Sequence, residues 1–566
     1  MKIKLAESLG YCLGVRRAMN MAFRHLSRRG EKVFSHGELI HNNPALELLT
    51  EKGLKIWNGE TSGAIIVRAH GLPPEQLQAL KRTDLTISDA TCPRVLKVQN
   101  LVAREAGSGR DVIIWGGANH PEVIGLVGHS LGRGYVVKDA AEVAKLPQFE
   151  RVLLVSQTTQ DLEQWPEIEA AVLARWPEAM IRNTICEATV ARQGDVRQLV
   201  EEVDALLIIG GKTSGNTARL AGIGRRKGLK TLLAETVDDL EPDWFQGVKT
   251  LGIAAGASTS NWQIGQILEA VRTMTRPKGS FLPRLMRALV LSNIYAALGM
   301  AGLSQCAALL MGLPLEPFIF SFFFFQVISI HLLRDFTKGQ TVKFNDPDRQ
   351  YFMTKYRRPL IVFGALSFVM AALGAATGGT GLTFLMGIMW LTTLIYQFAP
   401  RPRGYEDWNI ARLLVKPAVL AAGWGAALVG AAGLFNMSPD MKISALTALS
   451  ALVAISGHIF SLVIMGDVLG AQGDQIFGRP SLPIILGEKR TKNALKLIFI
   501  IWTAWLAVSG FSGALPPLAF LMIISGPLYC LALLKPLFRS PYGYLFEAAM
   551  YGQLILTLAW VLVWAA

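Results

Sequence analysis

The chain has 566 residues, 51% of them hydrophobic, and a mean hydropathy of +0.35, which is too apolar for an entirely soluble protein. Its formal net charge is +14, but the part from Gly279 onward alone carries 21 Lys and Arg against 11 Asp and Glu. The same part contains the long apolar runs, so the basic excess indicates a membrane protein and not a nucleic-acid-binding one.

The first part of the chain, residues 1 to about 275, repeats an apolar β-rich run, a loop rich in Gly, Ser, Thr and His, and a helical stretch. The clearest runs are AIIVRAHG, DVIIWGGANHPE, RVLLVSQTT, ALLIIGGKTSGN and TLGIAAGAST. Alternating strands and helices predict α/β units with parallel sheets, whose ligands bind in loops beyond the carboxyl ends of the strands. Helix N-termini in these loops favour anions, so we expect a phosphate site there.

Three of the five cysteines, Cys12, Cys92 and Cys186, open short polar loops in this part. They are 80 and 94 residues apart, which disfavours a zinc ribbon or a thioredoxin-like site. The start MKIKLAESLG lacks the apolar run of a signal peptide, so we expect a reducing cytoplasmic setting without disulfides. A cysteine about every 90 residues predicts three similar α/β units around a common centre.

Other polar residues of these loops are candidates for the same site. They are His41, His70, His120, Glu122, Thr158, Ser214, Asn216 and Ser258. Each has a simpler interpretation alone, because a single loop histidine usually caps a helix and a single buried cysteine is usually a small core residue. The joint pattern therefore carries the prediction.

In chain order, GYCLGVRRAM, HNNPALELL, RAHG, DATCPRVLKV, HPEVIGLVG, SQTT, TICEATVARQ, TSGNTARL and AGAST resemble the 4-hydroxy-3-methylbut-2-enyl diphosphate reductase family, over about residues 1–275. The resemblance implies that Cys12, Cys92 and Cys186 hold a central [4Fe–4S] cluster, in which one iron is open to the substrate's hydroxyl. It implies reductive dehydroxylation of the allylic diphosphate to isopentenyl and dimethylallyl diphosphate. No GxGxxG fingerprint is apparent, so a ferredoxin or flavodoxin is the expected electron donor.

The resemblance also implies the remaining roles in the site. The residues that grip the diphosphate would be His41, His70, His120, Ser214, Asn216 and Ser258, with the backbone N–H of Gly215. Glu122 corresponds to the proton source, and either Thr158 or Thr159 would position it. Gly215 stands where a second serine is usual, so we expect weaker diphosphate binding, and Gln99 stands where a histidine is common.

The second part, residues 287–566, contains nine apolar stretches long enough to span a membrane. They are residues 287–310, 314–333, 359–378, 381–399, 413–435, 443–465, 494–511, 514–534 and 545–565. The basic segment 276–286 contains Pro and Gly and is the predicted linker, placed to contact anionic lipid head groups. An α/β domain followed by an all-α multi-pass membrane domain is therefore the predicted architecture.

Charge predicts the orientation of the membrane part. If residues 1–275 are cytoplasmic, the loops on that side carry eighteen Lys and Arg, and the opposite loops carry one, Lys442. This is the distribution that the positive-inside rule describes. We expect a multi-pass protein of the cell inner membrane with its N-terminal domain in the cytoplasm.

Two acidic segments end the second and sixth apolar stretches, HLLRDFTKGQTVKFNDPDR and GDVLGAQGDQIFGRPSLPIILG. Acids at membrane depth are costly and usually functional. The second segment, with Asp467 and Asp474 before Gly-Arg-x-x-x-Pro, resembles the second aspartate motif of the UbiA-type prenyltransferase superfamily, although Gly470 stands where an aspartate is common. That resemblance implies aspartates that hold Mg²⁺ on a polyprenyl diphosphate.

The first acidic segment departs from the motif, because Lys338 and Val342 follow Asp335 at places where acids are usual. Asn345, Asp346 and Asp348 offer substitute ligands, and an NDPDR turn is equally an ordinary helix cap. The leading hypothesis is a bifunctional reductase and prenyltransferase. A second hypothesis makes the helices only a membrane anchor, and a third makes the cysteines redox-sensing thiols without a cluster.

Overall fold

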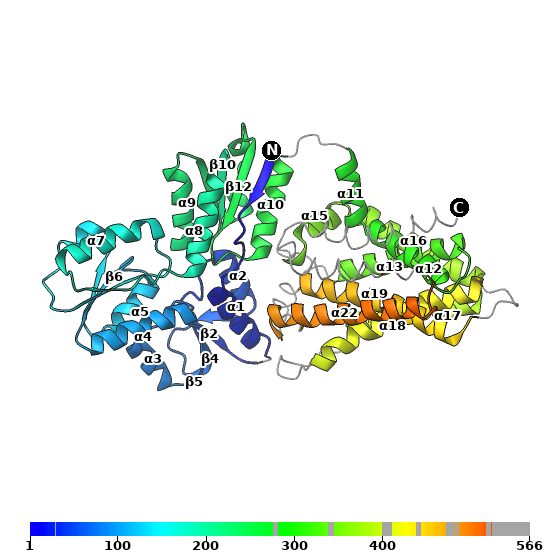
Figure 1. The fold of residues 1–566 in the computed structure, drawn as a ribbon, viewed down its shortest axis with the longest axis horizontal. Coiled ribbons are helices and arrows are strands. Elements are labelled where there is room, and N and C mark those ends of the chain that lie inside the picture. The colour runs from blue at the N-terminus through cyan, green and yellow to red at the C-terminus, as the bar shows by residue number, and fades with distance from the viewer. Residues whose placement is uncertain are drawn as a thin grey trace. The chain divides into compact units, whose positions relative to one another are not determined.

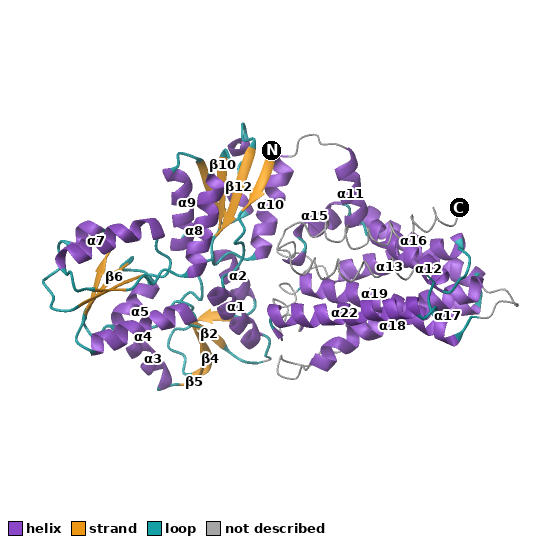
Figure 2. Cartoon of the chain, viewed as in Figure 1, coloured by secondary structure: helices purple, strands orange, loops and turns teal. Residues whose placement is uncertain are grey.

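In a computed structural model, the chain divides into two compact units, Met1–Pro277 and Lys278–Ala566 (Figure 1). The structure describes residues 1–275 without 29, then 281–337, 344–398, 410–436, 443–470, 481–482, 486–516 and 522. Figure 2 shows strands only in the first unit, where helices lie around them, whereas the described part of the second unit is helical.

The first unit contains three parallel sheets of four strands each, ordered β3-β2-β4-β5, β7-β6-β8-β9 and β11-β10-β12-β1. The strands are β1 (Lys2–Leu5), β2 (Val33–His36), β3 (Leu54–Ile56), β4 (Ser62–Val67), β5 (Asp84–Asp89), β6 (Asp111–Trp115), β7 (Gly134–Val137), β8 (Val152–Ser156), β9 (Met180–Ile181), β10 (Ala205–Ile209), β11 (Lys230–Ala234) and β12 (Thr250–Ala255). The three sheets share one topology, since β1 from the N-terminus takes the place in the third sheet that β5 and β9 hold in the others. The prediction of three similar α/β units is confirmed.

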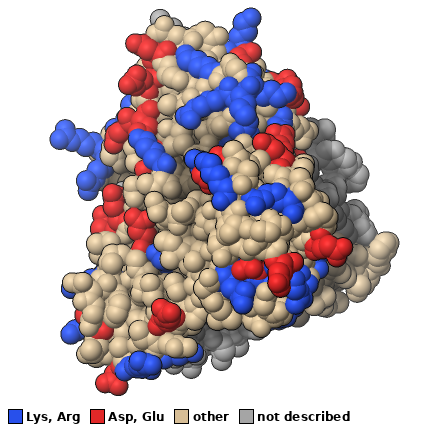
Figure 3. All heavy atoms as spheres, turned by 90° about the vertical axis from the view of Figure 1, so that its left-hand side faces the viewer, with Lys and Arg blue, Asp and Glu red and all other residues tan. Residues whose placement is uncertain are grey.

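Helices connect and cover these strands. They are α1 (Leu13–Leu26), α2 (Asn43–Glu51), α3 (Pro74–Lys81), α4 (Pro93–Gly107), α5 (Pro121–His129), α6 (Ala140–Val143), α7 (Trp165–Arg175), α8 (Glu187–Val200), α9 (Gly215–Arg226) and α10 (Asn261–Thr275), with short 3₁₀ turns at Leu162–Gln164, Val237–Asp239 and Pro242–Phe245. Strands β8 and β10 are buried at every residue, which explains their uninterrupted apolar sequences VLLVS and ALLII. On the face in Figure 3, acidic and basic side chains lie side by side, as on a solvent-facing surface.

The second unit is helical. Its described helices are α11 (Phe281–Leu291), α12 (Ile294–Leu310), α13 (Pro317–Thr337), α15 (Pro347–Lys355), α16 (Arg357–Thr377), α17 (Thr380–Phe398), α18 (Ile410–Asn436), α19 (Ala445–Leu469) and α22 (Glu488–Phe511). Six of them are long and apolar enough to cross a membrane, or up to seven spans if the bent pair α11 and α12 counts as one, among the described residues. Large side chains on α16 remain exposed, Val362 at 57% and Leu366 at 59%, which suits a lipid environment.

Two predicted segments of this unit differ in detail from the structure. The predicted first span, 287–310, is broken between α11 and α12, which meet at 69°. Asn293 stands at the break with a φ of 65°, a left-handed conformation that asparagine tolerates better than most residues. The predicted linker, 276–286, is helical from Phe281 onward. The last two predicted spans, 514–534 and 545–565, lie almost wholly outside the described residues, so nine helices are not confirmed.

Candidate functional site

Equivalent loops of the three sheets carry the predicted site residues. After β2, β6 and β10 come His41, His120 and the segment Ser214–Asn216; after β4, β8 and β12 come His70, Thr158 and Ser258; after β5, β9 and β1 come Cys92, Cys186 and Cys12. All of these loops follow the carboxyl ends of parallel strands, where ligands of such sheets bind. The pseudo-threefold repeat thus gives each unit one cysteine and two polar positions.

The three cysteines have the same local geometry. Each precedes a helix, α1, α4 or α8, as its N-cap residue. Their backbone N–H groups donate at 2.9 Å to the carbonyls of Ala257, Ala69 and Thr158, each in the loop after the neighbouring strand of the same sheet. A helix N-terminus stabilises a thiolate, so all three positions suit a metal-bound sulfur.

The thiols also share one space. The pKa of Cys92 is raised by burial, is lowered by the N–H groups of Arg94 and Val95, and is raised again by the neighbouring Cys12 and Cys186. Gly14 of α1 packs directly on this group, because a Cβ atom there would lie 2.5 Å from the Cys92 sulfur. Three neighbouring cysteines without disulfides, whose thiolates would repel one another, are a donor set that a cationic iron–sulfur group fits.

Three histidines form a second cluster. The ring centroids of His41 and His70 are 4.4 Å apart, and each of these rings is 5.5 Å from that of His120. Burial and the neighbouring His41, together with Arg219 and Arg68, lower the pKa of His120 to about 4. Burial, the other two histidines and Arg68 also hold the pKa of His70 well below its usual value, so the rings of His70 and His120 favour the neutral form.

Several buried polar atoms around these rings have no partner among the described residues: Nε2 of His41, Nδ1 of His70, and both amide atoms of Asn216. Unpaired buried polar atoms are costly, so they indicate a polar ligand. The histidine nitrogens lie within 4.8 Å of one another, a spacing that would also suit a metal ion. Arg68 and Arg219, whose charges act on His120, instead favour an anion.

The loop before α9 and the loop after β12 add further polar groups to the three histidines. We call this set of polar groups, His41, His70, His120, Ser214, Asn216 and Ser258, the cradle. Ser214 caps α9 by accepting from the N–H of Thr217 at 3.4 Å, and Asn216 lies in the first turn of that helix. The hydroxyl of Ser258 donates to the carbonyl of His41 at 3.0 Å. Ser214, Gly215, Asn216 and Ser258 therefore stand with the histidines at helix N-termini, a setting that favours an anion.

Glu122 lies in the first turn of α5 and is buried at 2% exposure. One of its carboxylate oxygens accepts from the N–H of Thr158 at 2.6 Å, and the other from the Thr158 hydroxyl at 2.9 Å. Burial raises the pKa of Glu122, and the contacts with Thr158 and the charge of Arg219 lower it in part. Of the two threonines that the sequence left open, Thr158 contacts Glu122, whereas Thr159 accepts from Gln157 at 2.8 Å.

Comparison with known proteins decides the family. The LytB protein family matches residues 3–272. A 4-hydroxy-3-methylbut-2-enyl diphosphate reductase of Citrifermentans bemidjiense is 39% identical over 282 residues, which cover 49% of this chain and 99% of that protein. One from Aquifex aeolicus is 40% identical over 276 residues, which cover 48% and 96%. The chain belongs to the LytB family.

Two solved structures each cover about half of this chain. The reductase from Plasmodium falciparum covers 49% of this chain and 88% of its own, with 26% identity and a TM-score of 0.46. A UbiA homolog from Archaeoglobus fulgidus bound to GPP and Mg²⁺ covers 48% and 99%, with 14% identity and a TM-score of 0.31. Neither TM-score reaches 0.5, so the family rests on the sequence matches, which leave the membrane unit uncovered.

The first unit, Met1–Pro277, contains the LytB match and is called the LytB unit from here on. The sequence patterns missed two residues of its site. Arg68 follows β4, and Arg219 lies in α9; both act on His120, and neither was singled out although both stand inside matched strings, RAHG and TSGNTARL. Arg68 stands two residues before His70, so its place beside a predicted anion ligand was the available signal, whereas Arg219 is far from His120 along the chain and approaches it only through the fold. Gln99, which had no interpretation, is buried with an unpartnered Nε2 atom that would lie 2.4 Å from a Cβ atom at Gly71, the residue after His70.

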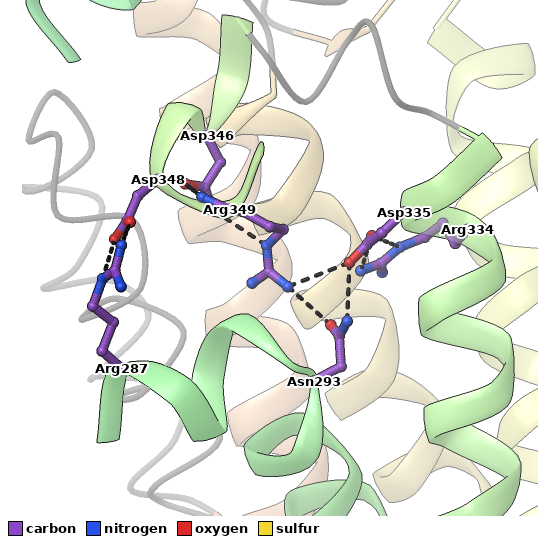
Figure 4. Close-up of polar contacts among 7 residues, drawn as sticks. All are labelled: Arg287, Asn293, Arg334, Asp335, Asp346, Asp348 and Arg349. Carbon is purple, nitrogen blue, oxygen red and sulfur yellow. Dashed lines mark hydrogen bonds and ion pairs between the residues drawn. The ribbon is translucent and has the colours of Figure 1, made fainter. Parts of the chain in front are cut away.

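In the membrane unit, the acidic side chains of the first segment form ion pairs with arginines (Figure 4). Asp335 is buried in α13 and accepts from Arg334 at 2.9 Å, from Asn293 at 3.0 Å and from Arg349 at 3.3 Å. Asp346 caps α15 by accepting from the N–H of Arg349 at 3.0 Å, with Asn345 beside it. Asp348 pairs with Arg287, whose Nε donates at 3.0 Å.

These residues as placed do not fit a magnesium site. Each of the carboxylates of Asp335, Asp346 and Asp348 accepts from a guanidinium, and a cation would have to displace that positive charge. In the second segment, Asp467 accepts from the hydroxyl of Tyr396 at 2.8 Å, and Asp474 lies outside the described residues. The structure therefore offers no described set of acids for Mg²⁺ at the first segment.

Proposed function

We propose that the LytB unit reduces 4-hydroxy-3-methylbut-2-enyl diphosphate to isopentenyl and dimethylallyl diphosphate. One observation carries the proposal: three cysteines, an orphaned polar cradle and one buried acid stand on equivalent loops of three sheets. The overall reaction consumes two electrons and two protons and releases water. A ferredoxin or flavodoxin is the proposed electron donor.

Cys12, Cys92 and Cys186 would hold a [4Fe–4S] cluster, because their helix N-termini and mutual repulsion suit a cationic group. When bound, the cluster supplies electrons and an iron without a protein ligand that acts as a Lewis acid. Glu122 would deliver the proton to the departing hydroxyl, since burial raises its pKa and so favours the protonated form. Thr158 fixes both carboxylate oxygens and so orients that proton.

The diphosphate would lie among the histidines and the α9 N-terminus. His120 accepts the N–H of Glu122 at its Nδ1 atom, at 3.1 Å, which leaves its Nε2 atom as the nitrogen that carries a proton. The unpartnered Nε2 of His41, Nδ1 of His70 and amide of Asn216 supply further polar groups. Ser214 and Ser258 lie beside them and offer hydroxyl groups.

Diphosphate binding is expected to take up protons. The free site holds the pKa values of His70 and His120 low, and a bound anion raises them, so affinity should increase as the pH falls from about 8 to about 6. Calorimetric titration with pyrophosphate, in buffers of different ionisation enthalpy, measures this uptake. His120→Gln should reduce it, whereas His129→Gln, at the far end of α5, should not. Equal uptake by wild type and His120→Gln would contradict the assignment, because the ionisation of pyrophosphate itself is common to both.

We propose that the membrane unit is a multi-pass domain of the cell inner membrane and that the LytB unit faces the cytoplasm. The six apolar helices and the eighteen-to-one distribution of Lys and Arg support this orientation. For its activity we propose Mg²⁺-dependent prenyl transfer to an acceptor, through Asp467 and Asp474. The arginine pairs of Asp335 and Asp348 favour a second candidate, an anchor without metal.

One set of variants separates these two functions. If the unit is a transferase, Asp467→Asn should abolish Mg²⁺-dependent prenyl transfer in membranes. If Asp335 serves only its arginines, Asp335→Ala should destabilise the fold by about 1–3 kcal/mol, because it removes one of the two carboxylates that pair with the buried Arg349, which keeps Asp346. Thermal unfolding in detergent, with and without Mg²⁺, measures this loss. The anchor hypothesis would be contradicted if Mg²⁺ raised the unfolding temperature of the wild type and Asp335→Asn abolished that increase.

A further inference from the structure

We propose that Arg219 is a further diphosphate-binding residue, which supplies from α9 the contact that Gly215 cannot make. The proposal rests on the proposed reductase function and deepens it. A Cβ atom at Gly215 would lie 2.8 Å from Nη1 of Arg219. The guanidinium thus occupies the space over the α9 N-terminus in which a side chain at position 215 would stand.

The positive charge of Arg219 is left for a ligand. This half-buried side chain makes no hydrogen bond or ion pair with any residue that the structure describes, although Asp161 and Glu122 lie close enough to act on it. Asp161 already accepts from Arg197 and Arg226, both at 2.6 Å. Both oxygens of Glu122 are taken by Thr158. No nearby acid therefore neutralises Arg219 fully.

Arg219 also lies on the correct side of the cradle. Its charge lowers the pKa of His120, the N-cap residue of α5, and its Nη1 atom lies close to Gly215 in the first turn of α9, so the guanidinium is near both helix N-termini. Asn216, the residue after Gly215, has amide atoms without a partner among the described residues. A guanidinium binds a phosphate with two parallel hydrogen bonds, which a serine hydroxyl cannot do. A glycine at position 215 gives it the room to reach the ligand, and we expect this cation to offset the missing hydroxyl.

Inhibition of the full-length enzyme by pyrophosphate tests the assignment. Arg219→Gln should raise the inhibition constant of pyrophosphate and the KM of the substrate together, by about 10- to 100-fold, with the visible spectrum unchanged. The matched control is Arg225→Gln, an exposed arginine of the same helix, which should change neither value. Arg219→Lys keeps the charge but loses the two parallel hydrogen bonds of the guanidinium, so its inhibition constant should fall between those of wild type and Arg219→Gln. This intermediate value would show that the loss in Arg219→Gln is not a folding defect.

A second substitution links the two positions. In the Arg219→Gln background, Gly215→Ser should recover part of the lost affinity, because the serine hydroxyl enters the vacated space. Unchanged inhibition by pyrophosphate in Arg219→Gln, or an equal rise in Arg225→Gln, would overturn the proposal. Failure of the reductase function would be seen separately as a wild type without turnover, and calorimetric binding of pyrophosphate would then still distinguish Arg219→Gln from Arg225→Gln.

Discussion

Glu122→Gln is expected to lower kcat by about 10²- to 10⁴-fold while KM changes little. Glutamine has the same shape and can still accept from the N–H of Thr158, so the fold and the cradle should persist. It carries no acidic proton, so the departing hydroxyl loses its proton source. Single-turnover kinetics with reduced enzyme would measure the effect. Glu167→Gln, at an exposed site in α7, is the matched control and should behave as wild type.

The dependence of activity on pH tests the role of Glu122 independently. Activity should fall as the pH rises through the pKa of this acid, because only the protonated form donates. The Thr158 hydroxyl lowers that pKa, so Thr158→Val should move the descending limb to higher pH. A normal kcat in Glu122→Gln, or a limb that Thr158→Val moves to lower pH, would mean that the proton comes from another group.

Replacement of Cys12, Cys92 or Cys186 by serine is the second change with a large expected effect. Each should abolish turnover and reduce the bound iron well below about four per chain, because three thiolates are needed to hold the cluster. Cys306→Ala, in membrane helix α12, should keep iron and activity. Iron content, sulfide content and visible absorption of anaerobically purified protein check this result.

The thiol-sensor hypothesis makes the opposite prediction for the same variants. Without a cluster, the wild type would be colourless under strict anaerobiosis, and the serine variants would differ from it only in thiol reactivity. Full iron occupancy in any of the Cys12, Cys92 or Cys186 variants would contradict the assigned ligands. The equivalent N-cap positions of the three cysteines lead us to expect equal losses from all of them.

The sequence predicted the three α/β units because each unit repeats a strand, a polar loop and a helix on a scale that local patterns capture. It could not show that β1 completes the third sheet, since this pairing joins Lys2 to Thr250 across the whole unit. Whether Thr158 or Thr159 faces Glu122 depends on the path of the backbone after β8. Two adjacent threonines give no sequence signal that distinguishes them. Arg219 was missed because its charge reaches the site only through the fold, whereas Arg68 stands two residues before His70 and the sequence offered a signal for it.

The membrane unit followed the sequence less closely. Long apolar stretches predicted most helices. The break at Asn293 depends on its left-handed backbone conformation, which a single asparagine in an apolar stretch is not enough to predict. The NDPDR turn was open to two interpretations, and the structure shows the helix cap, with Asp346 bound to Arg349. Arg287 is 61 residues from Asp348, so only the packed helices reveal that the acid is paired.

Reduction of 4-hydroxy-3-methylbut-2-enyl diphosphate by the full-length protein tests the central claim most directly. The protein would be purified anaerobically in detergent, its iron and sulfide measured, and the substrate added with a reduced electron donor. We expect about four irons per chain and conversion to isopentenyl and dimethylallyl diphosphate. A folded protein that holds no iron after cluster reconstitution, and that leaves the substrate unchanged, would contradict the account.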